Sequence, residues 1–169
     1  MRKKKLILIG GPMGIGKTTL GKYLVNHCLT NAVLLDGDWC WYMHPWLVND
    51  ENKQMVMRNS QFLLNSFIAN SNLETIVFVW VMHQQAIIDD LLAGLTGDFD
   101  VYSFSLIASE AELTKRFSQD INAGIRQPSA LSDALSRLPL YAKVASTKID
   151  VTGKCYQQIA PVILAAVGK

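Results

Sequence analysis

Residues 11–18 read Gly11-Pro12-Met13-Gly14-Ile15-Gly16-Lys17-Thr18 and match the pattern G-x-x-x-x-G-K-[ST] at every fixed position. Glycines at these positions let the backbone turn so that successive N–H groups point inward, where they bind phosphate oxygens. An apolar run at 5–9 precedes the motif and an amphipathic run at 18–28 follows it, which predicts the strand and the helix that such a loop connects. The motif therefore indicates a nucleotide phosphate site rather than a chance glycine-rich turn.

The residues of this loop predict a site for ATP and Mg²⁺. We expect Lys17 to contact the β- and γ-phosphates and the Thr18 hydroxyl to bind the metal ion. The helix that begins here would add the positive end of its dipole. The predicted nucleotide-binding residues are Gly11, Pro12, Met13, Gly14, Ile15, Gly16, Lys17, Thr18 and Thr19.

Short β-rich runs alternate with longer amphipathic runs along the chain. Strands are predicted at 5–9, 32–35, 75–82, 101–107 and 148–151. Helices are predicted at 18–28, 49–69, 84–95, after a capping box at 109–112, at 131–144, and at 155–167, where Pro161 would kink or restart the last one. Because no hairpin signal interrupts the alternation, we predict an α/β fold whose mainly parallel, five-stranded sheet lies between two layers of helices.

Composition limits the classes of function. Half of the 169 residues are hydrophobic and 18% are charged, which is enough for the core of one domain spanning 1–169. The net charge is +2, and we interpret the basic run at 2–5 as the solvated start of a strand rather than a nucleic-acid-binding arm. No segment reaches the apolar length that spans a bilayer. Three cysteines without paired spacing favour reduced thiols and a cytoplasmic location.

Two carboxylates follow the second predicted strand in Asp36-Gly37-Asp38. The carboxyl ends of parallel strands are where ligands of such sheets bind. The intervening glycine permits a tight bend, so both acids can face the γ-phosphate: one can hold Mg²⁺ through water, and the other can accept the proton of an attacking hydroxyl group. A plain Asx-type turn is the alternative, and the phosphate loop upstream favours the functional interpretation.

Four segments together carry a resemblance to a known group of proteins: 11–18, 34–38, 104–116 and 149–152. With them the chain resembles the small P-loop kinases of the gluconate kinase, adenylylsulfate kinase and shikimate kinase group. It is also similar to chloramphenicol phosphotransferase and to tunicamycin-resistance-type P-loop proteins. The resemblance implies the three-layer P-loop NTPase fold with a helical lid at about 120–145. It also implies Mg²⁺-dependent transfer of the γ-phosphoryl group of ATP to a hydroxyl group of a small molecule.

The resemblance implies roles for individual residues as well. Asp36 would join Thr18 on the metal side, and Asp38 would face the acceptor hydroxyl. Arg116 and Arg126 would be lid arginines that contact phosphate when the loop at 120–129 closes, although Arg116 also fits a solvated helix face. The predicted catalytic residues are therefore Lys17, Asp38, Arg116 and Arg126.

The end of the third predicted strand departs from many P-loop proteins. It reads Trp80-Val81-Met82-His83, with no acid where a Walker B aspartate would stand. This leaves metal binding to Thr18 and Asp36. His83 is a candidate substrate contact, and a histidine that only starts the next helix is the alternative.

Aromatic residues crowd the segment after Asp38, where relatives build the acceptor site. The predicted substrate residues are Asp38, Trp39, Trp41 and Arg58. Packing of the tryptophans beneath a long loop is the alternative. Because Lys53 and Arg58 are the only lysine or arginine residues between Asp38 and the third strand, we predict an acceptor with an apolar or planar face and at most one anionic group.

Other classes of function remain as alternatives. One is an ATP-binding protein that acts as a non-catalytic switch or resistance protein. Another is a GTPase, because 147–150 matches the guanine-reading pattern N/T-K-x-D, but no D-x-x-G motif follows the third predicted strand. A nucleic-acid binder lacks support because no basic stripe with interleaved aromatic residues is present.

Overall fold

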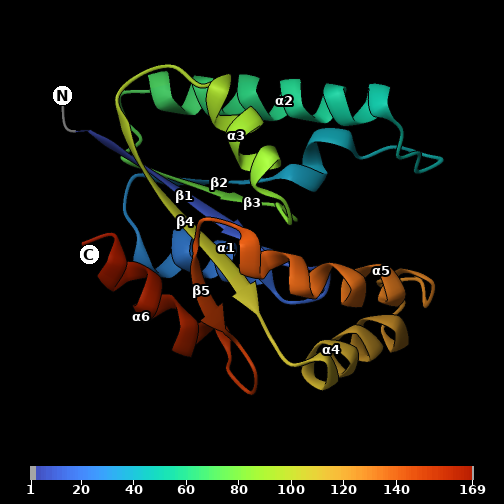
Figure 1. Ribbon diagram of the computed structural model, residues 1–169. Coiled ribbons are helices and arrows are strands. Elements are labelled where there is room, and N and C mark those ends of the chain that lie inside the picture. The colour runs from blue at the N-terminus through green and yellow to red at the C-terminus, as the bar shows by residue number, and fades with distance from the viewer. Residues whose placement is uncertain (1–2, 169) are drawn as a thin grey trace.

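The computed structural model describes residues 3–168, so Arg2 of the basic run lies outside the described residues. A five-stranded sheet with the order β2-β3-β1-β4-β5 forms the middle layer, and every neighbouring pair of strands is parallel (Figure 1). The strands are β1 (Lys4–Gly10), β2 (Ala32–Asp36), β3 (Thr75–Val79), β4 (Phe99–Ile107) and β5 (Thr147–Asp150). The predicted parallel α/β fold is confirmed.

Helices cover both faces of this sheet, with α2 and α3 on one face and α1 and α6 on the other (Figure 1). The α-helices are α1 (Lys17–Tyr23), α2 (Asp50–Ala69), α3 (Gln85–Ala93), α4 (Glu110–Asn122), α5 (Ala130–Arg137) and α6 (Tyr156–Ala166). Shorter turns are π-helical at Leu24–Cys28 and 3₁₀-helical at Gly37–Trp41 and Leu138–Lys143. None of the helices within residues 3–168 combines the length and the apolar character that crossing a membrane requires.

Two hydrophobic clusters, one on each face, explain why the central strands are continuous apolar runs. Leu6 and Leu8 of β1 pack in the cluster that includes α2 and α3, whereas Ile7 and Ile9 pack in the cluster that includes α1 and α6. Successive side chains of a strand point to opposite faces, so a strand covered on both sides has no polar position. All four side chains are fully buried.

The third strand is shorter than predicted. It ends at Val79, and the following residues leave the sheet to pack against the loop after β1. There the Gly11 N–H donates to the Val81 carbonyl at 3.3 Å, and Met82 adopts a left-handed backbone conformation with φ of 37°. The prediction of a strand to Met82 is therefore wrong at its end, because apolar side chains alone do not distinguish a strand from a buried loop.

The segment at about 120–145, which was expected to form a lid, consists of the end of α4, a loop, α5 and the 3₁₀ turn Leu138–Lys143. The loop is shorter than the predicted 120–129, because α4 extends to Asn122. The helix predicted at 131–144 ends as an α-helix at Arg137 and continues as a 3₁₀ turn that contains Pro139. The final helix, α6, runs through Pro161 without the predicted break, and this proline is exposed on its outer side.

Candidate active site

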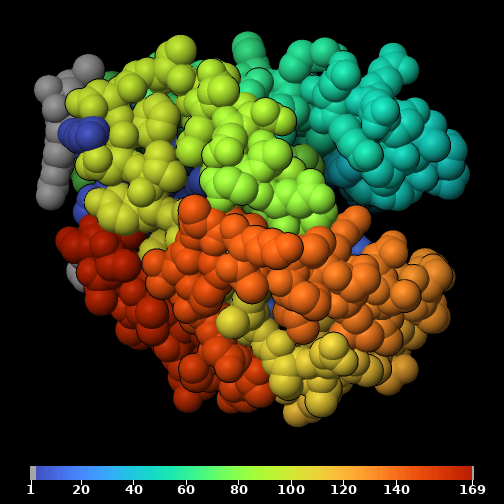
Figure 2. Space-filling view, viewed as in Figure 1, coloured from blue at the N-terminus to red at the C-terminus, as the bar shows by residue number. Residues whose placement is uncertain are grey.

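A large cavity lies where the carboxyl ends of three neighbouring strands meet. Its volume is about 1220 Å³, and its lining comes from the segments that follow β1, β2 and β3, from α2, and from the α4–α5 region. In Figure 2 the cavity opens between the teal and green segments above and the orange segment below. Ligand sites for one drug-sized molecule usually occupy about 300–1,000 Å³. The cavity is therefore large enough for nucleotide phosphates together with a second small molecule.

The loop from Gly11 to Gly16 forms one end of this cavity. Gly14 has φ of 81°, and a Cβ atom at this position would come within 2.9 Å of the Phe117 ring, so only glycine fits. Of the predicted nucleotide-binding residues, six line the cavity: Met13, Gly14, Gly16, Lys17, Thr18 and Thr19. The other three, Gly11, Pro12 and Ile15, are buried beneath the loop and shape it.

Lys17 bends back over the loop. Its Nζ donates a hydrogen bond to the Pro12 carbonyl at 3.0 Å. Burial lowers the pKa of Lys17 to about 8, against the opposing effect of the Asp38 and Asp36 carboxylates. An arriving phosphate group would add negative charge beside this amine and favour its protonated form. The position suits an ammonium group that binds phosphate.

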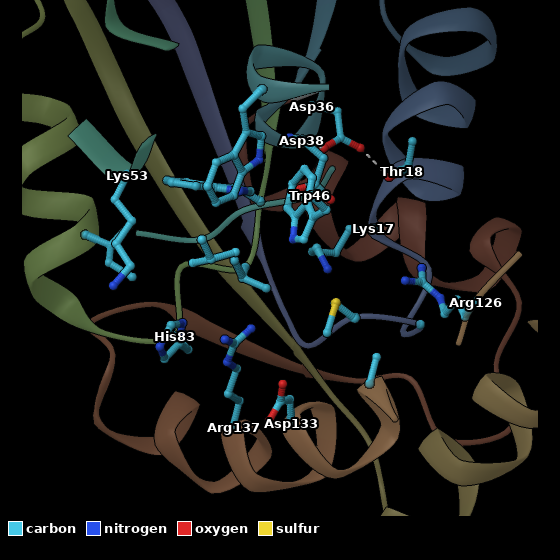
Figure 3. A pocket seen from close by; sticks show the side chains of 18 of the residues that line it. Lys17, Thr18, Asp36, Asp38, Trp46, Lys53, His83, Arg126, Asp133 and Arg137 are labelled. Atoms are coloured by element: carbon cyan, nitrogen blue, oxygen red, sulfur yellow. Dashed lines mark hydrogen bonds between the residues drawn. The ribbon is translucent and has the colours of Figure 1, made fainter. Parts of the chain in front are cut away.

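Thr18 and Asp36 form a pair at the edge between α1 and β2 (Figure 3). Thr18 Oγ1 donates to Asp36 Oδ2 at 2.5 Å, and the Asp38 N–H donates to Asp36 Oδ1 at 2.9 Å. Asp36 is only 6% exposed, so these two bonds orient its carboxylate. No group of three or more His, Cys, Asp or Glu residues with metal-binding spacing occurs within residues 3–168. A hydroxyl and one carboxylate beside a phosphate loop fit Mg²⁺, which usually keeps several waters and binds through few protein ligands and substrate phosphates.

Gly37 has a role that the sequence did not reveal. A Cβ atom at this position would lie 2.4–2.8 Å from atoms of the Trp80 indole, a contact that real side chains do not make. Glycine is required here because Trp80, the first residue after β3, packs directly against the backbone that links the two acids. Trp80 thus stands next to the acid pair and helps to set its position.

The 3₁₀ helix Gly37–Trp41 decides which of its side chains face the cavity. Side chains three residues apart in such a helix lie on the same side, and both Asp38 and Trp41 line the cavity. Trp39 turns away from it and is 51% exposed. The structure therefore places Trp39, a predicted substrate residue, outside the cavity lining, and it adds Trp46 and Trp80 to that lining.

The two predicted lid arginines lie in different surroundings. Arg116 donates hydrogen bonds to Glu112 and to the carbonyl groups of Ile15, Val151 and Lys154, at 2.8–2.9 Å. These bonds tie the phosphate loop to the segment after β5, and Arg116 is absent from the cavity lining. Arg116 therefore makes structural contacts here, and its predicted contact with phosphate stays a prediction. The capping box predicted at 109–112 is half formed. The Glu112 N–H donates to Ser109 Oγ, but the Ser109 N–H donates to Thr152 Oγ1 and not to the Glu112 side chain.

Arg126 lines the cavity and pairs with Asp120, with Nε 2.8 Å from Oδ2. Arg137, at the end of α5, also lines the cavity, and its side chain points into it beside His83 (Figure 3). Among the described residues Arg137 has no hydrogen-bond or ion-pair partner. Sequence reasoning missed this arginine. The one available signal was helical spacing, since Asp133 and Arg137 lie four residues apart on one face of the predicted helix and both line the cavity.

The far wall of the cavity carries the remaining predicted contacts. Arg58, on α2, lines the cavity and is exposed, without an ion pair to any described residue. His83 also lines it, and burial, followed by the Arg137 charge, lowers the pKa of this imidazole. His83 is therefore neutral at pH 7 and able to accept or donate a hydrogen bond.

Comparisons with known proteins agree with this geometry. The profile of a family described as AAA domain matches residues 7–134, more than half of the chain. No curated protein matches the sequence. Similar solved structures include a gluconokinase from Sinorhizobium meliloti 1021, with 20% identity, 99% of this chain and 94% of that chain covered, and a TM-score of 0.69.

Two further solved structures are similar over nearly the whole chain. A tunicamycin resistance protein from Deinococcus radiodurans has 22% identity, 98% and 96% coverage and a TM-score of 0.72. A shikimate kinase from Acinetobacter baumannii, in complex with shikimate, has 21% identity, 98% and 93% coverage and a TM-score of 0.62. At these identities the likeness shows the fold, and it confirms the predicted resemblance to the small P-loop kinase group at that level. The chain belongs to the AAA domain family.

Proposed function

We propose that this protein is a Mg²⁺-dependent phosphotransferase that moves the γ-phosphoryl group of ATP to a hydroxyl group of a small molecule. The observation that carries the proposal is that one cavity is lined by the phosphate loop, by the Thr18–Asp36 pair and by the free carboxylate of Asp38. A cavity with a phosphate loop alone fits many nucleotide-binding proteins. The second carboxylate, facing additional space, is what a transfer reaction requires.

The residues at the loop end bind and orient the nucleotide. The loop N–H groups and the Lys17 ammonium would bind the β- and γ-phosphates, and Thr18 and Asp36 would hold Mg²⁺. The metal ion, when bound, neutralises charge on the β- and γ-phosphate oxygens. Because Asp36 is fixed by two hydrogen bonds, its orientation does not depend on the ligand.

Asp38 is the residue placed to receive a proton. It is exposed to the cavity, and its carboxylate accepts no hydrogen bond from the described residues, so it is free to bind a hydroxyl group. In the proposed step the acceptor oxygen forms a bond to the γ-phosphorus, and the bond from that phosphorus to the β–γ bridging oxygen breaks. The proton of the hydroxyl group passes to Asp38, and ADP leaves.

Positive charge from α5 and the preceding loop completes the site. Arg137 has no ion pair or hydrogen bond among the described residues. The guanidinium carbon of Arg126 lies 5.5 Å from the centre of the Phe117 ring, and its Nε donates a hydrogen bond to Asp120. A phosphoryl group in transfer spreads negative charge over its outer oxygens, and an arginine nearby stabilises that charge. We assign Arg137 to this role first, because within residues 3–168 its guanidinium has no ion pair or hydrogen bond that would have to break.

The GTPase alternative receives less support. In the pattern at 147–150, the Lys148 ammonium donates to the Ser146 carbonyl at 2.9 Å, and Asp150 Oδ1 accepts from the Thr152 N–H at 2.9 Å. Both side chains that would read guanine are engaged in local contacts. We therefore propose ATP as the donor, and competition of GTP against ATP for binding tests this choice.

Asp38→Asn tests the proposed function. ADP formation should depend on the presence of a hydroxyl compound, in a screen of hydroxylated metabolites and antibiotics, and should fall at least about 100-fold in the variant while ATP still binds. Asp98→Asn is the matched control, since Asp98 is an exposed carboxylate that is not part of the cavity lining. ATP binding with no acceptor-dependent ADP formation for any compound would favour the non-catalytic alternative.

A further inference from the structure

Three indole rings line the part of the cavity beyond the acid pair. We call Trp41, Trp46 and Trp80 the tryptophan wall; they are three of the four tryptophans in the chain. Trp41 meets Trp46 edge to face with ring centroids 4.5 Å apart, and it meets Trp80 in the same way at 6.4 Å. The wall is thus continuous, with Trp41 in its middle.

Two of the three rings are held firmly. Trp80 packs on the Gly37 backbone and is 8% exposed, and Trp41 is 9% exposed. The 3₁₀ helix that carries Trp41 is tied to α2, because Asn59 Nδ2 donates to the Cys40 carbonyl at 2.9 Å. A wall that is rigid before a ligand arrives loses little entropy when one binds.

Trp46 differs from the other two rings. It is 52% exposed although it lines the cavity, and the neighbouring Leu47 and Val48 are exposed to the same extent. Packing beneath a loop explains the burial of Trp41 and Trp80, but it does not explain an indole that remains open at the mouth of a cavity. A ligand that covers this ring would remove apolar surface from water.

The tryptophan wall is close to the candidate base. Asp38 and Trp41 are three residues apart on one 3₁₀ helix and lie on its same side. A hydroxyl group that meets Asp38 therefore brings the rest of its molecule against the wall. The charges of the whole cavity lining balance, because five cations face five carboxylates: Lys17, Lys53, Arg58, Arg126 and Arg137, and Asp36, Asp38, Asp90, Asp120 and Asp133. A polyanion would meet no excess of positive charge here.

We propose that the acceptor carries a flat, unsaturated ring system that packs against the tryptophan wall while its hydroxyl group meets Asp38. This inference rests on the proposed function, because it names the acceptor of the same transfer. Aromatic rings in offset or edge contact with indole gain affinity beyond what equal apolar area provides. An anionic sugar without several basic partners would lose affinity when it is desolvated.

A matched pair of alcohols tests the inference by binding alone. Naphthylmethanol and decahydronaphthylmethanol share the hydroxyl group and the carbon skeleton, but only the first is flat and unsaturated. Calorimetric titration of each, and of gluconate, is carried out with Mg²⁺ and a β,γ-imido analogue of ATP bound. We expect naphthylmethanol to bind at least about fivefold more tightly than the saturated alcohol or gluconate, which is the value of one well-placed ring.

Variants locate the binding site. Trp46→Ala should weaken naphthylmethanol binding about fivefold and Trp46→Phe should restore most of it, whereas Trp39→Ala, outside the cavity, should leave it unchanged. Equal binding of the two alcohols, no binding of naphthylmethanol, or tighter binding of gluconate that ignores Trp46 would each overturn the inference. Failure of the proposed function appears differently, as ATP binding without phosphoryl transfer to any hydroxyl compound, including those that the wall binds.

Discussion

The close approach of Trp80 to Gly37 makes a sharp prediction about Gly37→Ala. A Cβ atom at this position would lie 2.4 Å from the nearest indole carbon, whereas ordinary contacts begin at about 3.4 Å, so the two groups overlap by about 1 Å. Trp80 is only 8% exposed, so its indole cannot rotate into solvent without leaving its packed position. Either the indole or the backbone between Asp36 and Asp38 must move, and we expect a loss of about 1–3 kcal/mol in the free energy of unfolding.

Urea denaturation measures this loss, and two further variants test its cause. Gly10→Ala is the matched control, because a Cβ atom there finds its nearest neighbour at 3.5 Å and should cost little. In a Trp80→Ala background the methyl group at position 37 has room, so Gly37→Ala should then cost less than about 0.5 kcal/mol. An equal cost of Gly37→Ala in both backgrounds, or a cost no larger than that of Gly10→Ala, would show that the contact with Trp80 does not require glycine at position 37.

Three more predictions concern the charged residues of the site. Bound phosphate favours the protonated form of Lys17, whose pKa is about 8 without ligand, so calorimetry should show full ATP affinity below pH 8 and up to about a tenfold loss of affinity per pH unit above it. Lys17→Arg should abolish this pH dependence, and an equal dependence in both proteins would contradict the role of Lys17. Arg137→Ala should lower turnover about tenfold or more with little change in ATP affinity. Steady-state kinetics measures the turnover and calorimetric titration measures the affinity, and an equal fall in both would assign Arg137 to nucleotide binding. Arg116→Ala should instead lower the free energy of unfolding by about 2 kcal/mol, because the hydrogen bonds of Arg116 join the phosphate loop to the segment after β5. Unchanged stability together with lost turnover would instead indicate a catalytic role for Arg116.

The parts of the fold that depend on local pattern were predictable. The phosphate loop has a fixed spacing, and the apolar runs of β1 and β3 follow from burial on both faces of a parallel sheet. The alternation of strands and helices then limited the topology to a parallel arrangement.

The parts that depend on distant contacts were not predictable. The carbonyl groups that accept hydrogen bonds from Arg116 lie far from it in the sequence, one of them 101 residues away in the phosphate loop. The sequence around Arg116 therefore gave no sign of these hydrogen bonds. From the sequence Gly37 was interpreted as a turn residue, because Trp80, which packs against it, lies 43 residues further along the chain, just after β3. Trp39 and Trp41 could be told apart only once the short 3₁₀ helix was known, since side chains two residues apart on such a helix point in different directions.

Phosphorus NMR of the complete reaction shows whether the protein transfers the γ-phosphoryl group of ATP to a hydroxyl group. The protein is incubated with ATP, Mg²⁺ and each hydroxyl compound that it binds, and the fate of the γ-phosphoryl group is followed. We expect a new phosphate monoester signal that grows in step with ADP and is absent for the Asp38→Asn variant. Release of inorganic phosphate alone, or ATP that stays intact while bound beside a bound hydroxyl compound, would contradict it.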